Sequence, residues 1–206
     1  MPGAGVPIEA FLVSFGAVFV AELGDKSQLM ALTFAAGYPA LVVLAGVTIA
    51  TFIVHAVSVV LGVAFAAAIP TDLVQIIAGV AFFGFALWTL RGDSLDEKEQ
   101  GKASRAGGWA IVAVGTAFFL AELGDKTMLL TITLATTAEP WGTWLGSTLG
   151  MVAADAIAIA IGAWLGARLP EQAIKVFAAV AFVLFGVVLV AEGLGVSVPI
   201  LGPLLG

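Results

Sequence analysis

The sequence contains no cysteine among its 206 residues and only one histidine, His55. The absence of cysteine excludes disulfide bonds, thiolate metal ligands and a cysteine nucleophile. Charged residues make up only 11% of the chain, and no basic cluster points to nucleic acid as a partner. No nucleophile motif or cofactor signature accompanies the acidic residues, so we expect neither an enzyme nor a bound cofactor.

Apolar residues dominate what is present. They make up 61% of the chain, and the mean hydropathy of +1.14 lies outside the range of soluble domains. The apolar runs reach the roughly 20 residues that a helix needs to cross a bilayer, and they lack the alternation of β-barrel strands. We therefore predict an all-α membrane protein, in contact with the lipid bilayer, with six transmembrane helices at about 8–36, 41–68, 72–91, 108–136, 142–168 and 172–194.

The hexapeptide Ala-Glu-Leu-Gly-Asp-Lys occurs twice, at 21–26 and at 121–126. The same offset of one hundred residues relates other positions, among them Gly46 and Gly146, Gly62 and Gly162, and Pro70 and Pro170. The chain therefore divides into a first three-helix repeat (1–91), a linker loop (92–107) and a second three-helix repeat (108–206). Because three is odd, the second repeat enters the membrane from the opposite side, which gives the inverted repeats of many secondary transporters.

Basic residues outside the repeated motif all fall on one side of the predicted spans. They are Arg91, Lys98, Lys102, Arg105, Arg168 and Lys175. Loops rich in lysine and arginine stay in the cytoplasm. We therefore expect a multi-pass protein of the plasma membrane, with both termini outside and the loop 92–107 in the cytoplasm.

Each motif places two carboxylates and a lysine inside an apolar span, where charges are costly and usually functional. Counting the helix rise puts Glu22 and Glu122 at the same depth, near the bilayer midplane. If each span is one helix, Glu22, Asp25 and Lys26 share a face, because their spacing is i, i+3, i+4. A duplicated scaffold without transport activity is the alternative, but it has no reason to keep intramembrane carboxylates in both halves.

The candidate metal ligands are hard oxygen donors: Glu22, Asp25, Ser27, Glu122, Asp125 and Thr127. Gln28 adds an amide oxygen. Such a set suits Mn²⁺, Ca²⁺ or Mg²⁺, as a transported substrate. Four carboxylates and two lysines sum to −2, which either one divalent cation or two protons would neutralise. This competition predicts exchange of the cation for protons, with the two repeats rocking around a central site.

Four further side chains have two interpretations each. Lys26 and Lys126 either form i,i+4 pairs that make the glutamates tolerable, or serve as tethered counter-ions when the metal is absent. His55 and Asp155 occupy equivalent repeat positions near span centres. His55 is either a neutral, hydrogen-bonded interior histidine or a proton relay. Asp155 has no local basic partner, which favours proton coupling or an accessory ligand role.

The paired Glu-x-Gly-Asp-Lys-Ser/Thr motifs, at 22–27 and 122–127, resemble the signature of the GDT1 family. The resemblance covers essentially the whole chain. It implies transport of Mn²⁺ or Ca²⁺ in exchange for protons, with the carboxylates at 22, 25, 122 and 125 as the cation site. The compact chain looks like prokaryotic members, which are chiefly linked to manganese efflux. A divalent cation channel or uniporter and an exporter of small cationic solutes are the alternatives.

Overall fold

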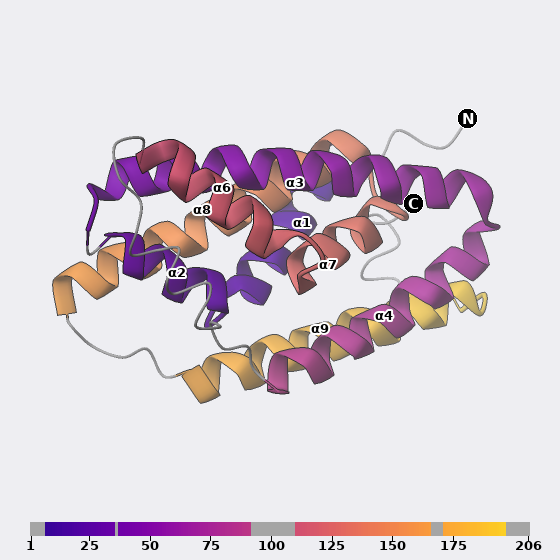
Figure 1. The fold of residues 1–206 in the computed structure, drawn as a ribbon. Helices are drawn as coiled ribbons and strands as arrows, with labels where there is room; N and C mark the ends of the chain where they lie inside the picture. Colours follow the sequence, from indigo (N-terminus) through magenta and orange to yellow (C-terminus); the bar gives the residue numbers. More distant parts are fainter. Residues whose placement is uncertain (1–6, 36, 92–109, 166–170, 197–206) are drawn as a thin grey trace.

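The structure is a computed structural model that describes residues 7–35, 37–91, 110–165 and 171–196. These residues form helices joined by short turns (Figure 1). The helices of the first repeat are α1 (Pro7–Glu22), α2 (Lys26–Ala35), α3 (Ala40–Ala68) and α4 (Thr71–Arg91). Those of the second are α6 (Ala110–Glu122), α7 (Lys126–Ala135), α8 (Pro140–Leu165) and α9 (Glu171–Gly193). The expected all-α class is confirmed for the described part of the chain.

Four of the described helices are long and apolar enough to cross a membrane, namely α3, α4, residues 140–160 of α8 and residues 176–193 of α9. They correspond to four of the six predicted spans. The other two predicted spans, 8–36 and 108–136, are not continuous helices. Each consists of two shorter helices, α1 with α2 and α6 with α7, so the expectation of one unbroken helix there is wrong.

Glycine in a left-handed conformation causes both interruptions. Gly24 has a φ of 75° and Gly124 a φ of 78°, a region that residues with a Cβ atom rarely adopt. In each repeat the amide of the motif aspartate then donates to the carbonyl of the motif glutamate, three residues earlier, at 3.0 and 3.1 Å. We call residues 23–25 the first break and residues 123–125 the second break. The shared helix face expected for Glu22, Asp25 and Lys26 therefore does not exist.

The two repeats interleave in space. α1 of the first repeat packs along α8 of the second repeat. The equivalent helices, α6 of the second repeat and α3 of the first, also pack along each other. α4 packs along α9, and the two helices run together along the lower edge of Figure 1. Each repeat therefore forms much of its helix packing with the other repeat.

Individual contacts also come in pairs that the hundred-residue offset relates. A Cβ atom on Gly46 would meet Val114 and Gly115, and one on Gly146 would meet Phe11 and Phe15. Where α3 crosses α8, equivalent residues meet each other, because Thr51 Oγ1 lies 3.4 Å from Met151 Sδ. A residue that contacts its equivalent in the other repeat is expected to lie at a pseudo-two-fold axis. The axis then passes between the two residues of the pair.

A cluster of phenylalanines fills the contact between α4 and α9, and its members occupy equivalent positions in the two repeats. The ring centroids of Phe82 and Phe182 lie 5.9 Å apart, and Phe85 and Phe185 join the same cluster. Aromatic pairs at such separations are favourable beyond the apolar area that they bury. The cluster packs against α1 and α7, so it joins the α4–α9 pair to the helices that carry the motifs.

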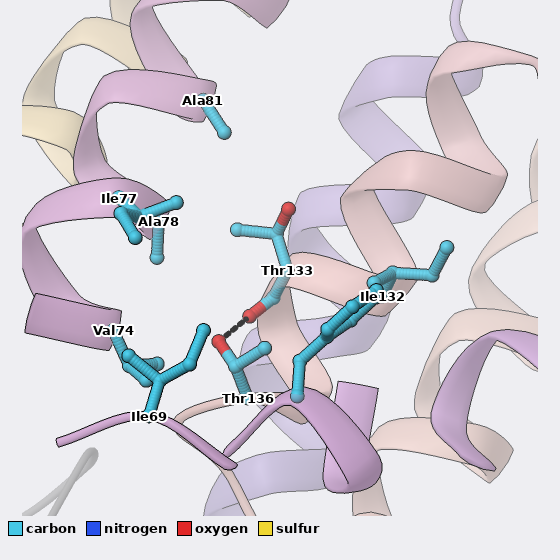
Figure 2. A pocket seen from close by; sticks show the side chains of 9 residues that line it. Ile69, Val74, Ile77, Ala78, Ala81, Ile132, Thr133 and Thr136 are labelled. Atoms are coloured by element: carbon cyan, nitrogen blue, oxygen red, sulfur yellow. Dashed lines mark hydrogen bonds between the residues drawn. The ribbon is translucent and has the colours of Figure 1, made fainter. Parts of the chain in front are cut away.

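Two apolar grooves border the α4–α9 pair. One has a volume of about 340 Å³ and lies between α4 and α7, with Val74, Ile77 and Ala81 facing Ile132 and Thr133 (Figure 2). The second groove, of about 200 Å³, lies between α1 and α9. Among the described residues, no charged side chain lines either groove. Neither groove is therefore a candidate cation site.

The predicted linker 92–107 lies outside the described residues, as do Lys98, Lys102, Arg105 and Arg168. The orientation that depends on these residues stays a prediction.

The close packing of α1 on α8 predicts that position 150 tolerates only glycine. In Gly150→Ala the new Cβ atom would lie 2.6 Å from the carbonyl oxygen of Phe15, so the two helices must separate. We expect a loss of about 1–3 kcal/mol in stability, as overpacking usually costs. Gly16→Ala on α1 is the matched control, because no atom lies within 4 Å of its Cβ position. Thermal unfolding in detergent measures both variants, and equal stability would contradict this packing.

Candidate functional site

The two breaks bring the motif carboxylates together in the interior. Glu22, Asp25, Glu122 and Asp125 are all buried. The charge of Glu22 is close enough to those of Asp25, Glu122 and Asp155 to be repelled by them, and Glu122 also interacts with Asp125. We call these five carboxylates the acidic cluster. It contains the carboxylates of both sequence motifs together with Asp155. The prediction that these residues form a single central cation site stays a prediction.

Each glutamate is held by a hydroxyl group of its own repeat. The Ser27 hydroxyl hydrogen-bonds to Glu22 Oε1 and also lies 3.2 Å from Asp25 Oδ2. Thr127 Oγ1 donates to Glu122 Oε2 at 2.7 Å. These bonds cross the break in each repeat, so they fix the glutamate at the end of one helix against the start of the next.

Each aspartate, by contrast, is paired with the lysine of the other repeat. Lys126 Nζ forms an ion pair with Asp25 Oδ1, and Lys26 Nζ lies 3.3 Å from Asp125 Oδ1. The interpretation of the lysines as i,i+4 partners within one motif did not foresee this exchange. It follows from the breaks, because lysine begins a new helix and no longer lies one turn above the glutamate.

The two ion pairs differ in exposure. The Lys126 side chain is 5% exposed and its partner Asp25 is fully buried, whereas the Lys26 side chain is 19% exposed. Attraction between opposite charges is stronger where water is excluded, and so is the cost of leaving one charge without its partner. The Lys126–Asp25 pair therefore carries the larger electrostatic constraint.

Several carboxylate oxygens of the acidic cluster have no hydrogen-bond partner among the described residues. They are Glu22 Oε2, Glu122 Oε1, Asp125 Oδ2 and both oxygens of Asp155. Buried polar atoms are normally satisfied, so these oxygens are available to protons or to a cation. Within the described chain, however, no three acidic or histidine side chains are already grouped as the ligands of a metal ion. The cluster would have to rearrange around a cation.

The two equivalent positions on α3 and α8 differ in their surroundings. Asp155 on α8 is fully buried and its charge interacts with that of Asp25. His55 on α3 is also fully buried, but neither ring nitrogen has a hydrogen-bond partner in the described part of the chain. The interpretation of His55 as a hydrogen-bonded interior histidine is therefore not what the structure shows.

Gln28 was expected to offer an amide oxygen to the cation. Instead, Gln28 Oε1 accepts a hydrogen bond from the Gly24 amide at 2.8 Å, and Nε2 donates to the Ala154 carbonyl at 3.2 Å. Both ends of the amide are thus engaged. The equivalent residue, Met128, accepts the Gly124 amide at its sulfur atom, at 3.2 Å.

Sequence reasoning overlooked a group of buried hydroxyls without hydrogen-bond partners in the described residues: Ser14 on α1, Thr89 on α4, and Ser147 and Thr148 on α8. Small polar residues are common where transmembrane helices pack closely, so their presence in an apolar span is a weak signal. Ser14 lies on α1 and Ser147 and Thr148 lie on α8, and these two helices pack against each other.

Comparison with known proteins assigns the chain to a family. A family model described as "Divalent cation/proton antiporter GDT1" matches twice, at residues 10–97 and 110–197. The chain belongs to the GDT1 family. GDT1 proteins are membrane transporters rather than enzymes, and the doubled match agrees with the repeat read from the sequence. No solved structure shows significant similarity to this GDT1 chain.

Relatives of this GDT1 chain include bacterial, plant and fungal proteins. A Vibrio cholerae protein named "Putative manganese exporter" is 34% identical, and the alignment covers 84% of this chain and 86% of the relative. The Synechocystis GDT1-like protein sll0615 is 31% identical over 88% of this chain and 96% of its own length. The Arabidopsis thaliana chloroplast protein PAM71 is 32% identical over 88% of this chain and 56% of its own length.

The unequal burial of the two ion pairs predicts unequal effects of lysine removal. Lys126→Met leaves Asp25 buried without its partner, which we expect to cost about 3–5 kcal/mol. Lys26→Met should cost less, because this lysine is partly exposed. Thermal unfolding in detergent compares the variants, and Asp25→Asn combined with Lys126→Met should recover much of the loss. Equal destabilisation by the two single variants would argue against the assigned pairs.

Proposed function

We propose that this GDT1 protein exports a divalent cation across the plasma membrane in exchange for protons. Mn²⁺ is the first candidate and Ca²⁺ the second. The observation that carries the proposal is the acidic cluster, in which carboxylates from both motifs are buried together and each aspartate is paired with the lysine of the other repeat. The printed name of the Vibrio cholerae relative supports Mn²⁺ as the substrate.

In this proposal Glu22, Asp25, Glu122 and Asp125 bind the cation, with Ser27 and Thr127 as further oxygen donors. Lys26 and Lys126 act as tethered counter-ions, because their ammonium groups neutralise the aspartates when no cation is bound. An arriving cation has to displace both lysines. Protons compete with it for the glutamate oxygens that lack hydrogen-bond partners in the described chain.

We propose separate roles for Asp155 and His55. Asp155 is a carboxylate of the acidic cluster, which favours it as an accessory ligand or as a carrier of exchanged protons. His55 stays a candidate proton relay, supported by its buried and unsatisfied ring nitrogens. Gln28 acts through the backbone contacts described above rather than as a ligand.

We also propose that the chain crosses the membrane six times, as two inverted repeats at 1–91 and 108–206 joined by a cytoplasmic loop at 92–107, with both termini outside. The broken helices would form one span each, and such discontinuous spans are typical of transporter binding sites. The paired contacts around Thr51 and Met151 support this symmetry. A cluster closed by two ion pairs favours alternating access over a channel, which needs weak binding at several sites.

Removal of one motif carboxylate should abolish transport. We expect Glu122→Gln to reduce Mn²⁺ efflux from cells, and their tolerance of Mn²⁺, to the level of cells without the protein. Glu192→Gln at the end of α9, away from both motifs, is the matched control and should retain efflux. Expression of each variant is measured in parallel. Full efflux by Glu122→Gln would refute the proposed cation site.

Coupling to protons is tested in reconstituted vesicles. With a pH gradient imposed, Mn²⁺ should move against the direction of proton flow, and a pH-sensitive dye inside the vesicles should report the protons. Ca²⁺ and Mg²⁺ in place of Mn²⁺ measure selectivity. Mn²⁺ movement without any proton movement would identify a uniporter or channel instead of an exchanger.

A further inference from the structure

We infer that the two breaks are mechanically unequal and that Gln28 is the positioning residue that makes them so. Gln28 fastens the first break to α8, whereas the second break has only Met128 at the equivalent position. The second break is then the part of the site that opens during transport. The transport consequence rests on the proposed function, but the mechanical inequality does not.

The Gln28 side chain connects the first break to α8, because its two amide atoms bind different partners. The Gly24 amide is freed by the left-handed turn and would otherwise lack a partner, which is unfavourable in an apolar surrounding. Gln28 satisfies this amide and at the same time donates to the carbonyl of Ala154 on α8. Because Gln28 is itself buried, water competes little for either bond. The first break is therefore fixed next to Asp155, the residue that follows Ala154.

The second break lacks this attachment for a chemical reason. A thioether is a weak acceptor and has no hydrogen to donate, so Met128 holds the Gly124 amide weakly and cannot tie it to α3. Leu123 is 46% exposed and Gly124 is exposed, whereas Leu23 and Gly24 are half-buried. α7 packs on α3, where a Cβ atom on Gly62 would meet Ile132 and Ala135.

Opening of the second break has a defined consequence for the acidic cluster. The helix that follows this break begins with Lys126, the partner of Asp25. Movement of the second break therefore withdraws the ammonium group from Asp25, while Glu22, Asp25 and Asp155 keep their positions. The first repeat and α8 would then present a fixed half-site, and the second repeat would supply the moving half.

Hydrogen exchange of the protein in detergent, followed by mass spectrometry, tests the inequality without any transport assay. In the wild type, peptides that cover 23–28 should exchange more slowly than peptides that cover 123–128. Gln28→Met should raise exchange at the first break by roughly tenfold, as the loss of its hydrogen bonds implies. Met128→Gln, the reciprocal variant, should slow exchange at the second break. Equal exchange at the two breaks in the wild type would overturn the inference.

Transport by the same variants in vesicles tests the consequence. Met128→Gln should lower the maximal Mn²⁺ rate by about tenfold, the cost of opening an added hydrogen bond, with KM almost unchanged. Gln28→Met should mainly raise KM, because the fixed half-site loses its position, and Gln28→Asn should behave likewise because its amide is too short. If Met128→Gln slows hydrogen exchange at the second break but leaves the maximal Mn²⁺ rate unchanged, the second break is not the part that opens during transport. Absence of Mn²⁺ transport by the wild type would count against the proposed function alone.

Discussion

A charge inside a membrane needs a partner, and here each aspartate of the repeated motif has the lysine of the other copy. The pairs Lys126–Asp25 and Lys26–Asp125 make each half of the site incomplete without the other. A single repeat would lose both ion pairs, and removal of one partner from a buried ion pair is strongly destabilising. The interleaved packing of α1 on α8 and of α6 on α3 serves this constraint, because it holds both breaks in one interior.

The helix breaks are what allow the exchange of partners. In a continuous helix, residues four apart lie on one face, and each lysine would neutralise the glutamate of its own motif. A left-handed glycine ends one helix at the glutamate and lets the aspartate begin the next. The glutamate is then free to bind its own hydroxyl, Ser27 or Thr127, and the lysine is free to reach across. Because of one glycine per repeat, the glutamate forms its hydrogen bond within its own repeat and the lysine forms its ion pair with the other repeat.

Sequence patterns predicted the parts of this arrangement that are local. Hydropathy placed α3, α4, α8 and α9 within a few residues, because long apolar runs need no knowledge of their neighbours. The breaks were missed because the motif was read as part of one helix. A glycine followed by aspartate and by serine or threonine also signals the end of one helix and the start of another. Pairing between Asp25 and Lys126, which are 101 residues apart, depends on helix packing that no short pattern encodes.

The differences between the repeats lie outside the shared hexapeptide. Gln28 corresponds to Met128, Asp155 corresponds to His55, and the two lysines are buried to different degrees. Identical motifs give both halves the same charges, yet a site that opens to one side of the membrane at a time cannot be symmetric in any one state. In two truly equivalent halves neither break would be favoured to move first. Residues flanking the motifs remove this equivalence. In the proposed mechanism the hexapeptides therefore bind the cation, and the residues beside them determine which half of the site moves.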